Sequence, residues 1–132
     1  MENGNILRPC HVRTAPEVSL RNYSSPDERF SLVLLDLDSI PTADTDRTYL
    51  HWCVLNFPGN NIKGGDEVTP YFSPMPYYDS GLHRFFFLLF KHTQPLTPVV
   101  LNEVVELCMR REGFNLTRWT KVLGFDPYTV VK

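Results

Sequence analysis

The hydrophobic pattern divides the first part of the chain into strand-like segments. Residues 18–20 alternate over a short run, whereas residues 30–35 are almost continuously apolar, as in a strand buried on both faces. Residues 50–57 mix aromatic and β-branched side chains, and residues 84–92 form the most apolar stretch of the chain. We predict four strands here, the last two central in the sheet, and a further short strand at residues 67–72.

After residue 96 the apolar positions recur at helical spacing. Thr97 is a suitable N-cap and Pro98 a suitable first-turn residue for a helix that runs until Gly113. Residues 116–123 predict a second helix, with Gly124 at the position after its end. Because the strands come first and the helices last, the pattern favours a mainly β, α+β domain over a doubly wound α/β one.

Length and charge narrow the function classes. A chain of 132 residues has the size of a single domain, which argues against a multidomain enzyme. Its 13 basic and 15 acidic side chains give a net charge of −2, so no overall field favours nucleic acid or an anionic membrane. No segment has the apolar length of a membrane span or the pattern of a targeting peptide, and we expect a soluble, cytoplasmic protein.

The three cysteines are widely spaced along the chain. Cys10, Cys53 and Cys108 form no CxxC pair, and their number is odd. This usage predicts free thiols in a reducing compartment and makes a structural zinc site improbable.

Polar side chains gather at the ends of the predicted strands. Asp36 and Asp38 follow one strand, His51 opens the next, and His83 with Arg84 opens the last. Ends of antiparallel strands converge on one edge of a sheet, so these five residues are expected to line a single pocket.

Three kinds of chemistry are compatible with this set. Two carboxylates and two histidines are potential metal ligands, although their spacing matches no specific metal motif. A histidine base acting on Ser39, Ser73 or Ser80 would give a hydrolase, but no nucleophile-elbow sequence surrounds these serines. The third is an anion pocket, in which imidazoles and backbone N–H groups hold a phosphate-like group.

Several other residues are expected to have structural rather than ligand-binding roles. Arg84 is expected to pair with Asp36 or Asp38 and to hold the pocket wall in place. Trp52 and residues 85–87, three phenylalanines, are expected in the core. The adjacent Arg110 and Arg111 fit the preference of cations for a helix C-terminus.

Four short segments, taken together and in order, resemble the two signature regions of the phosphatidylethanolamine-binding proteins. They are DLDSIP at residues 36–41, YLHW at 49–52, NFPG at 56–59 and GLHRF at 81–85. The family includes kinase-inhibitor proteins of animals and flowering regulators of plants, and the resemblance runs from about Gly4 to the end of the chain.

The resemblance implies a mainly antiparallel β fold with one or two C-terminal helices, a small anion pocket and no enzymatic turnover. In such a protein the pocket binds a phospholipid headgroup or a phosphorylated partner such as a kinase, without metal or cofactor. By position, the ligand-binding residues are Asp36, Asp38, His51, Pro76 and His83. Arg84, Phe85 and Trp52 support the pocket. In these roles His51 and His83 donate to the anion, while Asp36 orients a histidine or accepts from the ligand.

Some features depart from the usual family pattern. Leu37 stands in place of a proline, the second proline is displaced to Pro41, and Phe85 stands where many members carry tyrosine. Other segments, among them YLHW at 49–52 and FLLFK at 87–91, resemble the family member of the mitochondrial large ribosomal subunit, which gives a structural ribosomal protein in mitochondria as the alternative. Against either branch, the chain is expected to lack the last strand of the domain.

Overall fold

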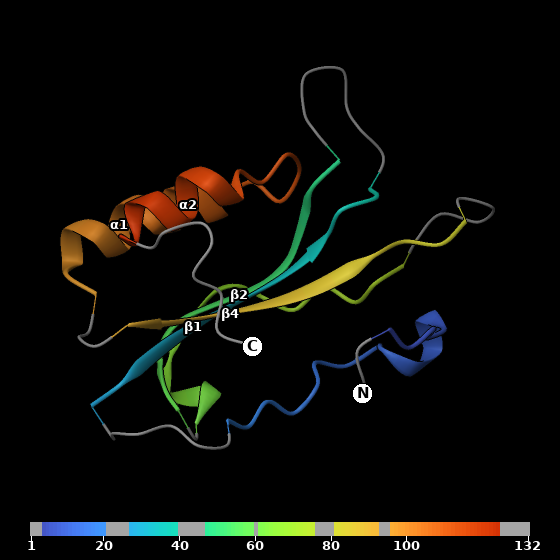
Figure 1. The fold of residues 1–132 in the computed structure, drawn as a ribbon, viewed down its shortest axis with the longest axis horizontal. Helices are drawn as coiled ribbons and strands as arrows, with labels where there is room; N and C mark the ends of the chain where they lie inside the picture. The colour runs from blue at the N-terminus through green and yellow to red at the C-terminus, as the bar shows by residue number, and fades with distance from the viewer. Residues whose placement is uncertain are drawn as a thin grey trace.

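The computed structural model describes residues 4–20, 27–39, 47–59, 61–75, 81–92 and 96–124. Four strands form one antiparallel sheet in the order β3–β2–β1–β4. They are β1 (Arg29–Asp36), β2 (Tyr49–Pro58), β3 (Asp66–Thr69) and β4 (Phe85–His92). Helices α1 (Pro98–Cys108) and α2 (Leu116–Val122) cover one face of the sheet (Figure 1). The expected mainly β, α+β class is confirmed.

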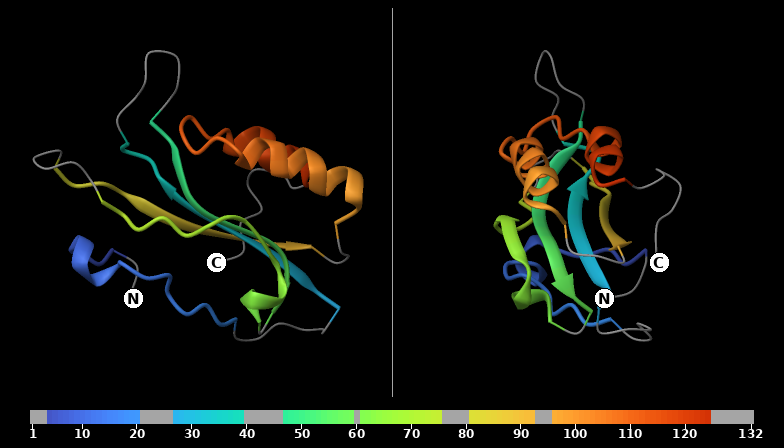
Figure 2. Two further views of the ribbon diagram at one scale, coloured as in Figure 1. Left: turned by 180° about the vertical axis from the view of Figure 1, so that it is seen from behind. Right: turned by 90° about the vertical axis from the view of Figure 1, so that its left-hand side faces the viewer.

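The N-terminal segment runs along the face of the sheet opposite the helices (Figure 2). It contains a 3-10 turn, η1 (Pro9–His11), and a second such turn, η2 (Ile62–Gly64), follows β2. Val18 and Leu20 pack from this segment against the sheet, but residues 18–20 form no strand, so that prediction is wrong. A run of three alternating residues is too short to distinguish a strand from an extended segment held only by its side chains.

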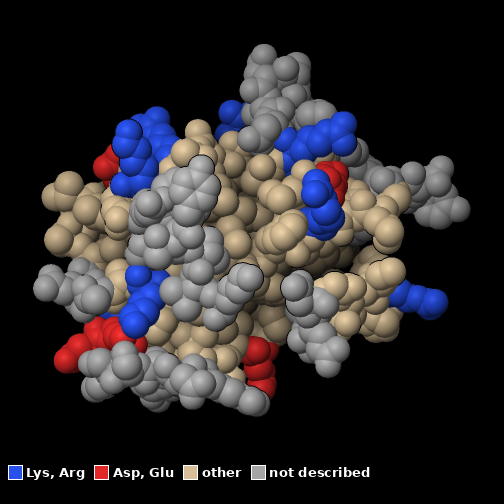
Figure 3. All heavy atoms as spheres, viewed as in Figure 1, with Lys and Arg blue, Asp and Glu red and all other residues tan. Residues whose placement is uncertain are grey.

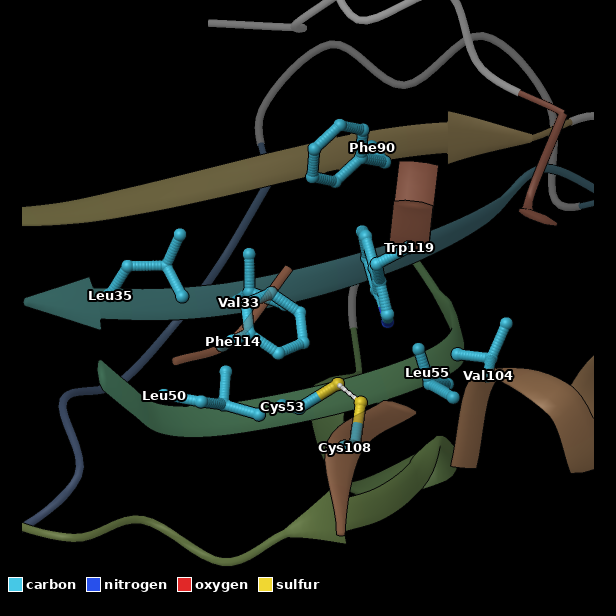
Figure 4. Packing of buried hydrophobic residues seen from close by; sticks show 10 residues of the cluster. All are labelled: Val33, Leu35, Leu50, Cys53, Leu55, Phe90, Val104, Cys108, Phe114 and Trp119. Atoms are coloured by element: carbon cyan, nitrogen blue, oxygen red, sulfur yellow. Dashed lines mark hydrogen bonds between the residues drawn. The ribbon is translucent and has the colours of Figure 1, made fainter. Parts of the chain in front are cut away.

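Side chains of β1 and β2 separate into two hydrophobic clusters, one on each face of the sheet. The cluster under the helices is shown in Figure 4 and consists of Val33, Leu35, Leu50, Cys53, Leu55, Phe90, Val104, Cys108, Phe114 and Trp119. The cluster on the opposite face consists of Phe30, Leu32, Leu34, Trp52, Val54 and Phe57. Burial on both faces explains why β1 reads as continuously apolar.

Both predicted helices are present, but the first ends at Cys108, so its predicted end at Gly113 is wrong. The Thr97 hydroxyl accepts a hydrogen bond from the backbone N–H of Val100 at 3.4 Å, and Pro98 occupies the first turn of α1. Asn115 caps α2 in the same way through Arg118, and Gly124 follows the helix with a φ of 79°. No helix in the described part of the chain is long and apolar enough to cross a bilayer.

Strand positions differ from the prediction in two places. β2 is central, but β4 lies at the edge of the sheet formed by the described residues. Phe86 is 42% and Phe87 38% exposed, so the prediction that these two residues lie in the core is wrong. The predicted short strand is present but ends at Thr69, because Pro70 has no N–H to donate. Residues 125–132, on which the expected lack of a last strand bears, lie outside the described part.

β2 bulges twice against β1. Leu35 pairs with Leu50 and Leu34 with Trp52, so His51 is an extra residue between them. The second shift lies between the pairs Phe30–Phe57 and Leu32–Val54. Near it, Asn56 adopts a positive φ of 61°. The first bulge re-aims the side chain of His51.

Candidate functional site

The predicted convergence of strand ends is present in the structure. β1 is antiparallel to both neighbours, and its last residue, Asp36, pairs with Tyr49 of β2 and Phe85 of β4. The C-terminal end of β1 and the N-terminal ends of β2 and β4 therefore meet at the same end of the sheet, where these strands start or stop. Asp36 and His51 are brought together here, and His83 precedes β4 by two residues.

Asp36 and His83 form a buried pair. The Nδ1 atom of His83 lies 2.8 Å from Oδ2 of Asp36, and the two side chains are only 6% and 7% exposed. The other carboxylate oxygen of Asp36 accepts the backbone N–H of Asp38 at 2.8 Å. Both oxygens are thus engaged, and the carboxylate fixes the orientation of the His83 ring. Orienting a histidine is one of the two roles expected for Asp36, and its acceptance of a hydrogen bond from a ligand stays a prediction.

The His51 ring is fixed in a defined tautomer. Its Nδ1 atom lies 2.7 Å from the carbonyl oxygen of Phe72, and because a carbonyl only accepts, Nδ1 carries the hydrogen. Among the described residues, Nε2 of His51 has no hydrogen-bond partner. Burial lowers the pKa of His51, while the contact with Phe72 and the negative charge of Asp36 act in the opposite direction. The neutral ring therefore presents a lone pair at Nε2.

Aromatic rings enclose the two histidines. Phe85 meets the His51 ring edge-on at 5.2 Å and stacks near the His83 ring at 6.4 Å. The ring of Tyr49, also on β2, has its centre 4.9 Å from that of the His51 ring. Phe85 thus packs against both imidazoles and supports their placement, and it brings no hydroxyl to the site.

Asp38 and Arg84 form the predicted ion pair. The guanidinium donates from Nε and Nη2 to the two oxygens of Asp38, each at 2.9 Å, and the backbone N–H of Arg84 donates to the same carboxylate at 2.8 Å. These hydrogen bonds lower the pKa of Asp38 to about 2. The pair holds the segment after β1 to the segment before β4, as expected of Arg84. The ligand-binding role of Asp38 stays a prediction.

Arg111 supports the site and was missed from the sequence. Its guanidinium donates to the carbonyl oxygens of Leu50 at 3.1 Å, His51 at 2.9 Å and Pro70 at 2.7 Å. It also lies 5.5 Å above the Phe72 ring. The interpretation of Arg111 as a partner of the helix C-terminus is wrong, because α1 ends at Cys108 and the side chain reaches across to β2.

Arg111 fastens the backbone that carries His51. The carbonyl oxygen of His51 accepts from Arg111 and also from the backbone N–H of Phe72 at 2.9 Å, while the Phe72 carbonyl oxygen accepts from the His51 ring. His51 and Phe72 are therefore joined by two hydrogen bonds, and one cation spans both of their chain segments. Because the acceptors are backbone carbonyls, which every residue has, no pattern of residue types predicts this role.

The remaining predicted residues support the core or lie outside the described part. Trp52 is buried in the cluster opposite the helices, against which Phe85 also packs, and its indole N–H donates to Glu67 at 3.0 Å. Its supporting role at the site stays a prediction. Pro76 and Ser80 lie outside the described residues. The described residues contain no group of three or more His, Cys, Asp or Glu side chains that could hold a metal ion.

Surface charge is dispersed on the face seen in Figure 3, where basic and acidic side chains lie in small separate groups. A shallow surface depression lies on the helix side, away from the strand ends. Its lining residues are Glu103, Asn115, Thr117, Arg118, Lys121 and Val122. It therefore does not coincide with the predicted site.

Sequence comparison relates the chain to characterised proteins. The family model for the phosphatidylethanolamine-binding proteins matches residues 1–123. The protein CENTRORADIALIS of Antirrhinum majus is 35% identical over 121 residues, which cover 90% of this chain and 63% of that protein. A 26 kDa secreted antigen of Toxocara canis is 32% identical over 127 residues, or 95% of this chain and 48% of the antigen.

A third relative is a putative odorant-binding protein, A5, of Drosophila melanogaster. It is 30% identical over 98 residues, which cover 73% of this chain and 45% of that protein. The chain spans about half the length of the curated relatives it matches. These comparisons give no support to the ribosomal alternative.

Proposed function

Because this chain belongs to the phosphatidylethanolamine-binding protein family, we propose that it is a binding module without enzymatic turnover, whose ligand is a phosphate-type anion. The anion is the headgroup of a phospholipid or the phosphoryl group of a modified partner. It binds at the strand ends that carry Asp36, His51 and His83.

The observation that carries the proposal is the fixed orientation of His51. Its Nδ1–H is committed to the Phe72 carbonyl, so Nε2 is left to contact a ligand. His51 as a whole residue is only 5% exposed and lies in a largely aromatic setting, where a hydrogen bond to an anion is stronger than in water. The Asp36–His83 pair supplies a second oriented imidazole beside it.

Proton uptake follows from this arrangement. Burial keeps His51 neutral by lowering its pKa, and a neutral Nε2 is an acceptor. An anion held against Nε2 favours the imidazolium, whose Nε2–H donates to it. The proposed ligand therefore binds more tightly as pH falls from neutral toward the pKa of the free site.

The proposal is tested by titrating the protein with O-phosphoethanolamine and with inorganic phosphate while the ring resonances of the histidines are followed by NMR. Both His51 and His83 are expected to shift with one common affinity, and His11, which is exposed on η1, is the internal control. A stronger response to phosphoethanolamine identifies a headgroup site, and equal responses identify a phosphoryl site. Anion binding that leaves the ring resonances of both His51 and His83 unchanged would contradict the proposal.

The variant His83→Ala is expected to weaken anion binding by roughly 1–3 kcal/mol, since it removes one hydrogen-bonding imidazole from a buried site. His11→Ala is the matched control and should bind as the parent protein does. Calorimetric titration measures both variants. Equal affinities for His83→Ala and the parent protein would remove His83 from the ligand contacts.

A further inference from the structure

Two cysteines meet in the core beneath the helices. Cys53 lies on β2 and Cys108 is the last residue of α1, and their sulfur atoms lie 3.6 Å apart, within hydrogen-bonding contact. Their exposed fractions are 0% and 3%. Figure 4 shows the two sulfurs facing each other between the sheet and the helix layer. The contact is separate from the strand-end site and has no part in the proposed anion binding.

The surroundings hold Cys108 in place against β3. The hydroxyl of Thr69 donates to the carbonyl oxygen of Cys108 at 3.2 Å, which ties the end of α1 to the sheet. The adjacent Trp119 is fully buried, and its indole N–H has no hydrogen-bond partner. A buried donor of this kind calls for an explanation, and it favours negative charge on a neighbouring group.

The two thiols differ in acidity. A hydrogen bond from the Cys53 thiol to a Cys108 thiolate lowers the pKa of Cys108, while burial opposes this shift. The shared contact and burial raise the pKa of Cys53 well above its ordinary value. Cys108 is therefore the first of the pair to become a thiolate, which is the nucleophilic form of cysteine.

We propose that Cys53 and Cys108 form an intramolecular disulfide by exchange with a small disulfide such as oxidised glutathione, and that this bond ties α1 to β2. The sulfurs approach from contact distance to a bond length of about 2.0 Å, a change within reach of side-chain rotation. The more distant Cys10 is exposed and takes no part.

The exchange proceeds in two balanced steps. The Cys108 thiolate attacks one sulfur of oxidised glutathione, the glutathione S–S bond breaks, and one glutathione thiolate leaves. Cys53 then loses its proton and attacks the Cys108 sulfur of the mixed disulfide, which releases the second glutathione thiolate. In sum, two protein thiols are oxidised, one glutathione disulfide is reduced to two thiols, and the protons of the protein thiols pass to the leaving groups.

Such a bond would join residues that are 55 positions apart in the chain. It would restrict the unfolded ensemble and stabilise the native packing of α1 on the sheet.

The test is to refold the Cys10→Ser variant in glutathione buffers of graded redox potential, which gives the buried thiols access to the reagent before the core closes. Mass spectrometry separates the dithiol, the mixed disulfides and the intramolecular disulfide, and the populations give the effective concentration of one thiol toward the other. The measurement is repeated in strong denaturant. Cys10→Ser/Cys53→Ala is the control that cannot form the bond.

The effective concentration is expected to be at least about tenfold higher in the folded than in the denatured protein, and the oxidised form should melt at a higher temperature by the same linkage. An effective concentration that is equal or lower in the folded protein would overturn the proposal, since the native packing would then not favour the bond. If the disulfide forms as expected but the protein binds no anion in either redox form, only the proposed function is refuted.

Discussion

The two ends of β1 carry similar polar groups that are used differently. At the C-terminal end Asp36 meets His83, and β2 bulges at His51. Toward the N-terminal end the buried Ser31 hydroxyl meets Nε2 of His92 at 3.3 Å, and the second bulge of β2 brings the backbone N–H of Asn56 to the same hydroxyl at 3.2 Å. Each end thus combines one histidine from the β4 side with one bulge.

The difference lies in which groups are already satisfied within the protein. Near Ser31 the Asn56 side chain accepts the backbone N–H of Leu96 at 3.4 Å, and its backbone N–H is paired with the hydroxyl. Near Asp36 the ring of His51 commits one nitrogen to the protein and keeps the other for a ligand. The comparison teaches that residue types alone do not mark a binding site; a rigidly held group with remaining hydrogen-bonding capacity does.

The strongest test of the site end is Arg111→Ala. Loss of the guanidinium removes the side-chain donor to the carbonyls of Leu50, His51 and Pro70. The His51 carbonyl keeps its hydrogen bond from the backbone N–H of Phe72. We expect a loss of about 2–4 kcal/mol in the free energy of unfolding, together with weaker anion binding. Urea denaturation measures the first effect and calorimetric titration the second.

Arg110→Ala is the matched control for this prediction, because Arg110 is exposed and is the neighbouring arginine in the chain. It should leave both quantities nearly unchanged. Equal behaviour of the two variants would show that charge near the helix end matters, and not the hydrogen bonds to β2.

The opposite end is tested by Ser31→Ala. This change leaves the backbone N–H of Asn56 without its buried acceptor, so we expect a loss of about 1–3 kcal/mol in the free energy of unfolding. Anion affinity should stay at the parent value, in contrast to Arg111→Ala. Ser19→Ala, at an exposed position, serves as control. A loss of affinity in Ser31→Ala would contradict the division of roles between the two ends.

The third prediction concerns pH. Burial lowers the pKa of His51 below its unfolded value of about 6.5, so the unfolded chain takes up this proton more readily. Stability is therefore expected to fall as pH drops below about 6.5 toward the folded pKa, with a slope from this group of at most ~1.4 kcal/mol per pH unit. His51→Asn, which cannot titrate, should show a flatter dependence in denaturation curves between neutral and mildly acidic pH.

The smallest effect is expected for Asp38→Asn. The ion pair with Arg84 is solvent-exposed, with the arginine side chain 68% exposed, and exposed pairs contribute little to stability. The stability supplied by this carboxylate is present above its ordinary pKa and is lost as pH falls toward about 2. The difference in melting temperature between low and high salt should be slightly larger for the parent protein than for the variant.

The sequence predicted the meeting of Asp36, His51 and His83 because that step needs only antiparallel strands and their ends. It also predicted both helices, since Thr97 and Gly124 are local markers of a helix start and end. It did not predict that β4 lies at the edge of the described sheet, because an apolar run reports burial of faces and not pairing of edges.

Other features escaped for a different reason. The bulge that re-aims His51 depends on the register between two strands, which no single strand contains. The role of Arg111 depends on backbone carbonyls, which every residue has. The Cys53–Cys108 contact joins β2 to the end of α1 and requires the helices to be packed on the sheet.

The central claim is that His51 is a neutral, oriented imidazole that becomes an imidazolium when an anion binds. Its pKa can be measured directly from the pH dependence of the His51 ring resonances, with and without saturating O-phosphoethanolamine. We expect a value below about 6.5 in the free protein and a clear rise in the complex. A His51 pKa that is the same in the free and the saturated protein would contradict the account.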